Sequence, residues 1–166
     1  YCFSNTALSS IDIPMNITTI NNRCFSDTQS LNQLTGASNV LILGSDVFSN
    51  TGFVTADHIL DTFAGAAGGS GILSECSKLV SAKLSENVSV IPSRAFENSP
   101  NFSLLDLGES QRDISIGAHA LSGLASDLLI KRPVTRDAAS KKVSYPTMSF
   151  DQLAVSPSNG AWGTDV

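Results

Sequence analysis

The stretch that decides the fold is 73–96, which reads Leu-Ser-Glu-Cys-Ser-Lys-Leu-Val-Ser-Ala-Lys-Leu-Ser-Glu-Asn-Val-Ser-Val-Ile-Pro-Ser-Arg-Ala-Phe. Its apolar residues follow neither the period of one helix nor the period of one strand. A short alternation at 82–84 is followed by Val88 and Ile91, and Phe96 comes five residues after Ile91. This spacing indicates a segment that turns corners, as one unit of an internal repeat does.

A phenylalanine or leucine marks each copy of the repeat, usually with an aliphatic residue five positions before it. The pairs are Ile20 with Phe25, Leu43 with Phe48, Ile91 with Phe96, and Ile116 with Leu121. Phe3 and Leu73 hold the marked position without a clear partner. A polar corner, a further apolar residue and a strand-like alternation follow the mark. The same ordered set occurs five times, which indicates a true repeat.

The strand-like alternation is clear at 11–13, 82–84 and 105–107, and weaker at 34–36 and 56–58. Successive side chains of a strand point to opposite faces, so the middle residue of each triplet points outward. One copy cannot fold alone. Its core residues contribute about 1.5–3 kcal/mol each when buried, whereas ordering each backbone residue costs about 1–2 kcal/mol. Stacked copies cover each other's apolar edges, so the pattern predicts a solenoid.

The repeat resembles the BspA-type leucine-rich repeat, with the pattern Ala-Phe-x-Asn-Cys/Thr-x-x-Leu-x-x-Ile-x-Leu-Pro-x-x-Val-x-x-Ile. It stands here as Cys-Phe-Ser-Asn-Thr-Ala-Leu-Ser-Ser-Ile-Asp-Ile-Pro at 2–14 and returns at 73–96. The resemblance implies a right-handed leucine-rich-repeat solenoid. Short parallel strands would form one face, with irregular or 3-10 turns and little helix on the other. It also implies a surface-exposed or secreted protein of host-associated bacteria or protozoan parasites, which adheres to host proteins or other cells.

The repeats are expected to occupy 1–132, with a last strand near 128–130 and a C-terminal cap and linker at 133–166. The sequence starts at Tyr1 within a repeat and without Met, so we expect a processed or excised piece of a longer protein, and whether the array extends upstream of Tyr1 is left open. The pattern breaks at 59–71, which is rich in glycine. We expect its glycine-rich part at 63–71 to form a flexible bulge on the convex side, where solenoids accept insertions.

The charge balance is acidic, with 10 Lys and Arg against 15 Asp and Glu and a net charge of −5. Nucleic-acid binding requires a basic face, so no nucleic-acid partner is expected. No apolar run approaches the roughly 20 residues that span a bilayer, so no membrane-spanning segment is expected either.

The three cysteines are Cys2, Cys24 and Cys76, and an odd number cannot pair completely within one chain. Cys2 and Cys24 directly precede marked phenylalanines, so we expect them on adjacent coils facing the core. They are interpreted as buried thiols that act as small apolar residues. A disulfide between them is an open alternative. The absence of Cys-x-x-Cys and of a close histidine disfavours zinc, and no metal or other cofactor is expected.

Catalysis has little support in the sequence. His58 and His119 are the only histidines, neither lies in a nucleophile motif, and Gly-x-Ser-x-Gly is absent. The glycine-rich stretch at 63–71 lacks the lysine of a P-loop and the context of a dinucleotide-binding unit. We expect no catalytic residues. A hydrolase built around His58 and the glycine loop is a distant alternative, and Asp57, His58 and Asp61 have no specific metal-site spacing.

Stacking in register places the outward residues of successive strands in a row about 5 Å apart. This row is the candidate binding site and consists of Asp12, Thr35, Asp57, Lys83 and Asp106. Solenoids bind partners through such extended faces. We therefore expect a non-catalytic binding domain, and the resemblance implies an extracellular or cell-surface protein as its partner. The alternative is a structural spacer that carries another domain and binds nothing itself.

Overall fold

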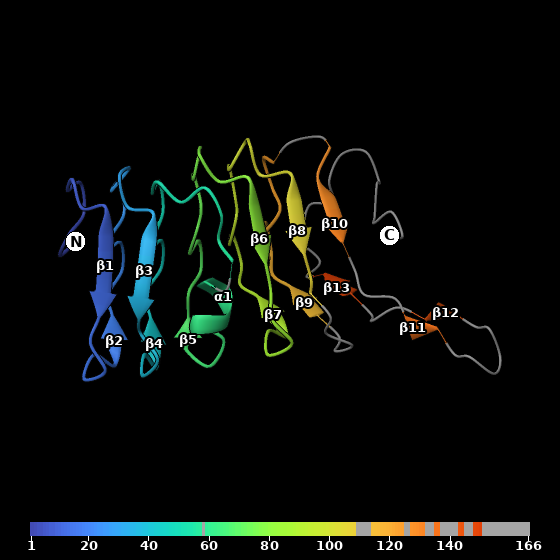
Figure 1. Ribbon diagram of the computed structural model, residues 1–166, viewed down its shortest axis with the longest axis horizontal. Coiled ribbons are helices and arrows are strands. Elements are labelled where there is room, and N and C mark those ends of the chain that lie inside the picture. The colour runs from blue at the N-terminus through green and yellow to red at the C-terminus, as the bar shows by residue number, and fades with distance from the viewer. Residues whose placement is uncertain are drawn as a thin grey trace.

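Figure 1 shows the computed structural model as coils stacked along one long axis. The structure describes 1–57, 59–108, 114–124 and 127–131, together with the backbone of three short strands at 135–136, 143–144 and 148–150. The described part is a parallel-strand solenoid of about five turns with almost no helix. The predicted fold class is therefore confirmed.

The first row of strands carries the alternations that the sequence predicted. It contains β1 (Ser10–Ile13), β3 (Gln33–Gly36), β6 (Ser81–Lys83), β8 (Leu104–Asp106) and β10 (Leu129–Lys131). All pairs are parallel, but they form two separate sheets, β1-β3 and β6-β8-β10. The third coil contributes only an isolated bridge from Thr55 to Ser81. β10 confirms the last strand expected near 128–130.

A second row of strands runs along another side of the coils, where the sequence predicted only irregular turns. It contains β2 (Thr19–Ile20), β4 (Ile42–Leu43), β5 (Ala67–Gly68), β7 (Val90–Ile91), β9 (Ile114–Ile116) and β13 (Met148–Phe150). These strands also pair in parallel, in the orders β2-β4-β5 and β7-β9-β13. Most are two residues long, too short to show a period of two in the sequence.

The segment 133–166, predicted as a cap and linker, contributes three of the described strands. β13 continues the second row beside β9. β11 (Thr135–Arg136) and β12 (Val143–Ser144) pair antiparallel with each other. The remainder of the predicted cap and linker lies outside the described residues.

The marked residues form the centre of the core. From the second coil onward their exposed fractions are at most 4%, in Phe25, Phe48, Leu73, Phe96 and Leu121. Rings of neighbouring coils stack, with centroids 5.5 Å apart for Phe3 and Phe25 and 5.4 Å apart for Phe25 and Phe48. Phe3 is 44% exposed because it lies on the first coil and has a described neighbour on one side only.

Each mark is tied to the next coil by a backbone hydrogen bond. The amide of Phe25 donates to the carbonyl of Val47 at 3.0 Å, and the amide of Phe48 donates to that of Ile72 at 3.1 Å. The same bond recurs one repeat before and after these, and again in the later coils. Left-handed residues stand two positions before and two after most marks, as at Arg23, Asp27, Asp46, Asn50, Arg94 and Asn98. Asn and Asp tolerate this conformation better than most residues, which explains the polar corners.

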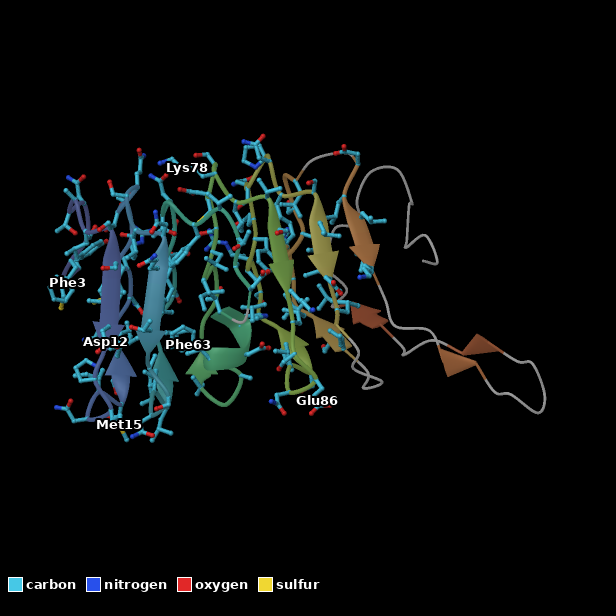
Figure 2. All side chains as sticks on the ribbon, viewed as in Figure 1. Phe3, Asp12, Met15, Phe63, Lys78 and Glu86 are labelled. Carbon is cyan, nitrogen blue, oxygen red and sulfur yellow. The ribbon has the colours of Figure 1, made fainter. Side chains whose placement is uncertain are left out.

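The prediction of a flexible bulge at 63–71 is only partly right: Ala64, Gly65, Ala67 and Gly68 are exposed, but the stretch is anchored to the core at its start and pairs with a neighbouring strand. A single helical turn, α1 (Ile59–Thr62), buries Ile59 and Leu60. Phe63, labelled in Figure 2, is 6% exposed. Its ring centroid lies 5.9 Å from that of Phe48. β5 then pairs with β4. Apolar residues at the start of the insertion therefore anchor it, and the sequence reading gave too much weight to its glycines.

Gly68 ends β5 with a φ of +100°, and a Cβ atom there would lie 2.1 Å from the carbonyl oxygen of Leu43. This position therefore requires glycine for both conformation and space. Gly65 differs, since a Cβ atom there would meet nothing within 4 Å.

The cysteine prediction is partly wrong. Cys24 and Cys76 are buried, but Cys2 is exposed because it lies on the first coil. All three thiols are free, so the disulfide alternative is not formed. Burial raises the pKa of Cys24 and of Cys76.

Candidate protein-binding face

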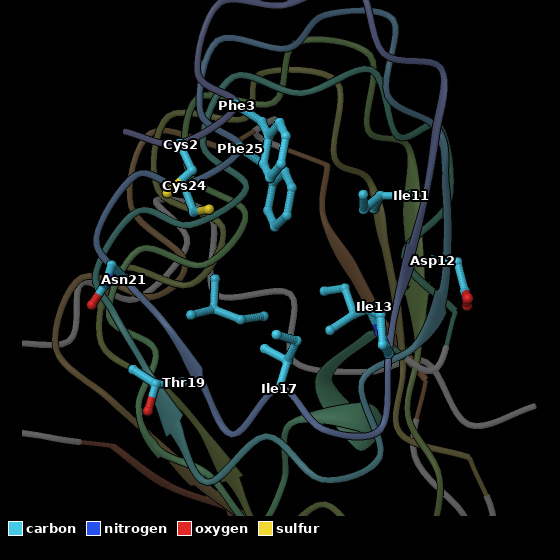
Figure 3. Close-up of a pocket in the computed structure, with 12 residues that line it drawn as sticks. Cys2, Phe3, Ile11, Asp12, Ile13, Ile17, Thr19, Asn21, Cys24 and Phe25 are labelled. Atoms are coloured by element: carbon cyan, nitrogen blue, oxygen red, sulfur yellow. The ribbon is translucent and has the colours of Figure 1, made fainter.

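The first half of the predicted row is well ordered on β1 and β3. Ile11 and Ile13 point into the coil, whereas Asp12 points outward (Figure 3). Asp12 is in register with Thr35, and the Thr35 hydroxyl donates a hydrogen bond of 2.7 Å to Asp12 Oδ1. Both residues are exposed. The structure thus places this pair side by side on the outer surface, as predicted.

The second half of the row lies on β6, β8 and β10. Lys83 is in register with Asp106, and Asp106 is in register with Lys131. Lys131 Nζ lies 3.4 Å from Asp106 Oδ2, while Asp106 Oδ1 accepts a hydrogen bond of 2.8 Å from the amide of Gly108. Charges of alternating sign therefore follow one another here. Lys131 is a member of this row that the sequence reading missed, although it follows the predicted last strand directly.

The row is interrupted between Thr35 and Asp57, whereas the bridge from Thr55 to Ser81 keeps Asp57 in line with Lys83. The third coil has no strand at this position. Asp57 Oδ1 instead accepts a hydrogen bond of 3.0 Å from the backbone amide of Lys83. Asp57 is therefore fixed against β6 and separated from Thr35. The weak alternation at 56–58 and the loss of the repeat pattern at 59–71 were the sequence signals of this break.

A groove lies at the break, between β3 and the third coil. Its cavity volume is about 450 Å³. Leu34, Phe53 and Ile59 supply its apolar surface, and Gln33, Thr55 and Asp57 supply polar edges. Phe53 and Ile59 are buried, whereas the three polar residues are exposed. The candidate binding face is thus a polar surface with one hollow near its middle.

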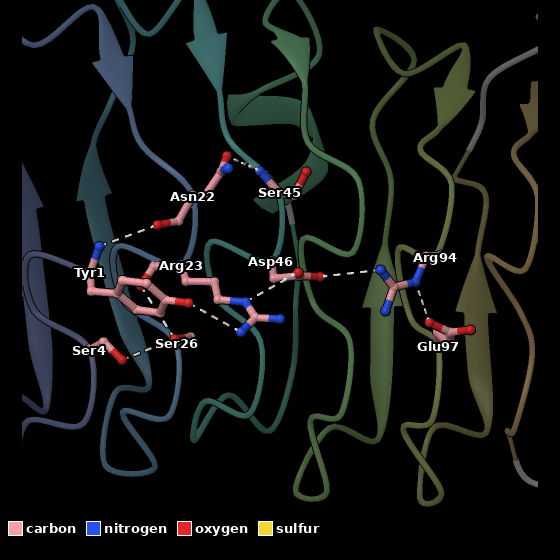
Figure 4. Close-up of polar contacts among 9 residues, drawn as sticks. All are labelled: Tyr1, Ser4, Asn22, Arg23, Ser26, Ser45, Asp46, Arg94 and Glu97. Atoms are coloured by element: carbon pink, nitrogen blue, oxygen red, sulfur yellow. Dashed lines mark hydrogen bonds and ion pairs between the residues drawn. The ribbon is translucent and has the colours of Figure 1, made fainter.

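A charged network occupies another side of the coils (Figure 4). Asp46 Oδ2 lies 3.5 Å from Arg23 Nε, and Asp46 Oδ1 lies 3.8 Å from an Arg94 Nη. Arg94 also bonds to Glu97, which raises the pKa of the Arg94 guanidinium. A Cβ atom on Gly71 would lie 2.2 Å from Asp46 Oδ1. Gly71 lies on the third coil, between Asp46 and Arg94. Because it has no side chain, the ion pair between Asp46 and Arg94 can form across the third coil.

The first coil leaves the end of the core open (Figure 3). A cavity of about 330 Å³ is lined there mainly by apolar side chains, among them Phe3, Ile11, Ile13 and Ile17. The opening follows from the geometry of a solenoid, whose terminal coil has a neighbour on one side only.

The hydrolase alternative finds no catalytic arrangement in the described residues. His119 is half-buried in a left-handed turn conformation, and His58 lies outside the described residues. Across the part of the chain that is described, no group of three His, Cys, Asp or Glu side chains is arranged to hold a metal ion. None of the helices described there has the length and apolar character needed to cross a bilayer.

The stacked parallel strands, buried marks and polar outer row define a leucine-rich-repeat solenoid. The profile of the BspA type leucine rich repeat region matches this chain in six copies over 1–125. The chain belongs to this family, which confirms the resemblance seen in the repeat. The family suggests a repeat domain that binds protein; its members are generally non-catalytic and typically surface-exposed or secreted. No curated protein and no solved structure matches the chain.

Proposed function

We propose that this chain is a non-catalytic protein-binding domain of a cell-surface or secreted protein. It adheres to a macromolecule of a host or neighbouring cell through the first row of strands. The observation that carries the proposal is the register of the outward side chains, because Asp12 with Thr35 and Lys83 with Asp106 stand side by side on one surface. Rigid strands hold these groups in fixed positions, which lowers the entropic cost of binding a partner.

The polarity of this face favours a charged protein partner. Asp12 and Asp57 give the N-terminal part of the face an acidic character, whereas Lys83, Asp106 and Lys131 alternate in sign. Complementary charges on a partner would increase the association rate and select the orientation of binding. The described face offers no exposed tyrosine or tryptophan, so we expect modest affinity that decreases with salt.

A structural spacer is the second candidate, and one observation favours it. Several outward groups already have partners within the chain: Asp12 with Thr35, Asp57 with the Lys83 amide, and Asp106 with Lys131. Groups that are already bonded gain less from a partner. In a spacer, the sole role of such a face would be to keep the coils soluble and aligned.

Binding of the purified chain to a panel of extracellular-matrix and plasma proteins tests the proposal. The test variant combines Asp12→Lys, Asp57→Lys and Asp106→Lys. A control combines Thr19→Lys, Ile42→Lys and Val90→Lys, which adds positive charge at exposed positions of the second row. Circular dichroism and thermal unfolding verify that both variants are folded.

We expect saturable binding that the test variant weakens about tenfold or more and the control leaves nearly unchanged. Equal binding by the test variant and the natural chain would place the site away from the first row. No binding to any member of the panel would favour the spacer.

A further inference from the structure

β3 is an edge strand in the middle of the solenoid. It pairs with β1 on one side, and its sheet ends there. On the other side, no backbone hydrogen bond joins β3 to the described residues of the third coil. The third coil bonds to the fourth coil instead, since the Ala56 amide donates a hydrogen bond of 2.8 Å to the Ser81 carbonyl. An open strand edge therefore lies inside the stack.

The groove already described runs along this edge. In a parallel sheet the peptide groups of a strand point alternately to its two neighbours, so part of the peptide groups of β3 face the groove. The cavity of about 450 Å³ falls within the range of binding pockets, about 300–1,000 Å³. Its surface combines the apolar side chains of Leu34, Phe53 and Ile59 with the polar edge at Thr55 and Asp57.

We propose that this groove accepts an extended peptide segment of a partner protein, which adds a strand to the free edge of β3 and places a basic residue beside Asp57. The inference rests on the proposed function as a protein-binding domain and names the kind of segment that is bound. An added strand gains backbone hydrogen bonds regardless of its sequence, while alternate side chains supply specificity.

The groove also determines which side chains suit the segment. Residues of a strand alternate between two faces, so every second side chain would contact the apolar groups of Leu34 and Phe53. The intervening side chains would face the edge of the groove. Asp57 is exposed there, and within the described chain no ion pair joins it to a cation. An alternation of aliphatic and basic residues is therefore the best fit to this site.

A synthetic peptide provides the probe, with the sequence Lys-Val-Lys-Val-Lys-Val-Lys and blocked ends. One comparison peptide has glutamate in place of every lysine, and a second has proline in place of the central valine. Binding is measured by titration calorimetry, and amide hydrogen exchange reports which backbone groups become protected. The natural chain is compared with Thr55→Trp, which fills the groove, and Asp57→Asn, which removes its charge but keeps the hydrogen-bond acceptor.

We expect the lysine peptide to bind and to slow the exchange of amides in 33–36. Thr55→Trp should weaken binding about tenfold or more, and Asp57→Asn roughly two- to fivefold. The control variants Thr19→Trp and Asp127→Asn, at exposed positions away from the groove, should bind as the natural chain does. The glutamate and proline peptides should not bind, the former for its charge and the latter because proline lacks an amide donor.

Failure to bind the lysine peptide, or binding that Thr55→Trp leaves unchanged, would overturn the inference. Concentration-dependent dimerisation that Thr55→Trp abolishes would also overturn it, since a second copy would then occupy the groove. The adhesion proposal is tested separately with Asp12→Lys and Asp106→Lys, which lie outside the groove lining. If a panel protein fails to bind the variant with Asp12→Lys and Asp106→Lys but still binds the Thr55→Trp variant, the adhesion proposal stands and the peptide-groove inference fails.

Discussion

The fourth and fifth coils stack on each other in both rows, whereas the third coil pairs with one neighbour in each row. β6 pairs with β8, and β7 pairs with β9. The third coil instead bonds to β6 in the first row, through Thr55 and Ala56, and to β4 in the second row, through β5. It therefore crosses the stack obliquely. A solenoid can thus accept a poorly matching repeat by changing its neighbour from one side to the other.

The oblique path leaves space that other groups occupy. α1 and Phe63 fill the interior of the third coil, and the contact between Asp46 and Arg94 spans it on the outside. The groove beside β3 is the part that remains unfilled on the first row. The regular coils thus supply continuous strand pairing, and the irregular coil leaves the groove that we propose as a peptide site.

The largest expected effect is loss of a core ring from a regular coil. Phe96 is fully buried, and its ring stacks on that of Phe102 with centroids 4.5 Å apart. Phe96→Ala should lower the free energy of unfolding by about 4–5 kcal/mol, whereas Phe63→Ala in the irregular coil should cost about 3 kcal/mol, because looser surroundings collapse more readily around a cavity. Urea unfolding measures both. Equal losses would mean that the third coil is packed as rigidly as the others.

A second comparison uses two glycines of the irregular coil. Gly68→Ala combines a positive φ with a contact of 2.1 Å to a backbone carbonyl, so it should lower stability by about 2 kcal/mol or more. Gly65→Ala meets nothing within 4 Å and should change stability by less than about 1 kcal/mol, in the stabilising direction. Thermal unfolding of both variants checks this difference. A neutral Gly68→Ala would show that β5 is free to move away from β4.

The pH dependence of stability tests the boundary between the third and fourth coils, where Cys76 is fully buried. Burial raises the pKa of its thiol above the ordinary value of 9.0, so the folded chain keeps this proton at a pH where the unfolded chain releases it. The resulting stabilisation is complete below pH 9 and is lost as pH rises through the folded pKa. Natural chain and Cys76→Ala are compared by urea unfolding from pH 7 to pH 10.5. The natural chain should lose more stability over this range, and identical pH profiles would contradict the prediction.

The smallest expected effect concerns the contact that spans the third coil. Arg23 and Arg94 are about half exposed, so Asp46→Asn should lower stability by no more than about 1 kcal/mol at low salt. The difference should shrink in 1 M salt, where screening acts within about 3 Å. Asp27→Asn, another corner carboxylate, is the control. A loss that salt does not reduce would indicate that the side chain acts by packing against Gly71 rather than by charge.

Much of the fold followed from the sequence because the marked core residues, from Phe3 to Leu121, recur at nearly regular steps of 22 to 25 residues. The positions of Phe25, Phe48, Phe96 and their aliphatic partners predicted which residues are buried, and the alternations predicted β1, β6 and β8. The polar corners were also visible, since Asn, Asp or Gly stands two positions after every mark except Leu73, which Glu75 follows at that distance. The two-residue strands were not, because their pairing depends on the neighbouring coil and leaves no local pattern.

The candidate site was predicted less completely than the core. The sequence placed Asp12, Thr35, Lys83 and Asp106 on the outer face, where the structure has them. It could not show that Asp57 turns toward the Lys83 amide, because that choice depends on how the third coil crosses the stack. The groove arises from the same crossing, so no single segment carries its signal.

The backbone bond that ties each mark to the next coil also has a consequence for how the chain folds. Every such bond closes a loop about one repeat long, so each coil has nearly the same loop-closure entropy. Folding can then begin at any pair of well-matched coils and spread to its neighbours. If the chain is pulled from its ends, the regular coils should resist as one block, and extension should begin at the third coil, where the fewest strands hold the stack together.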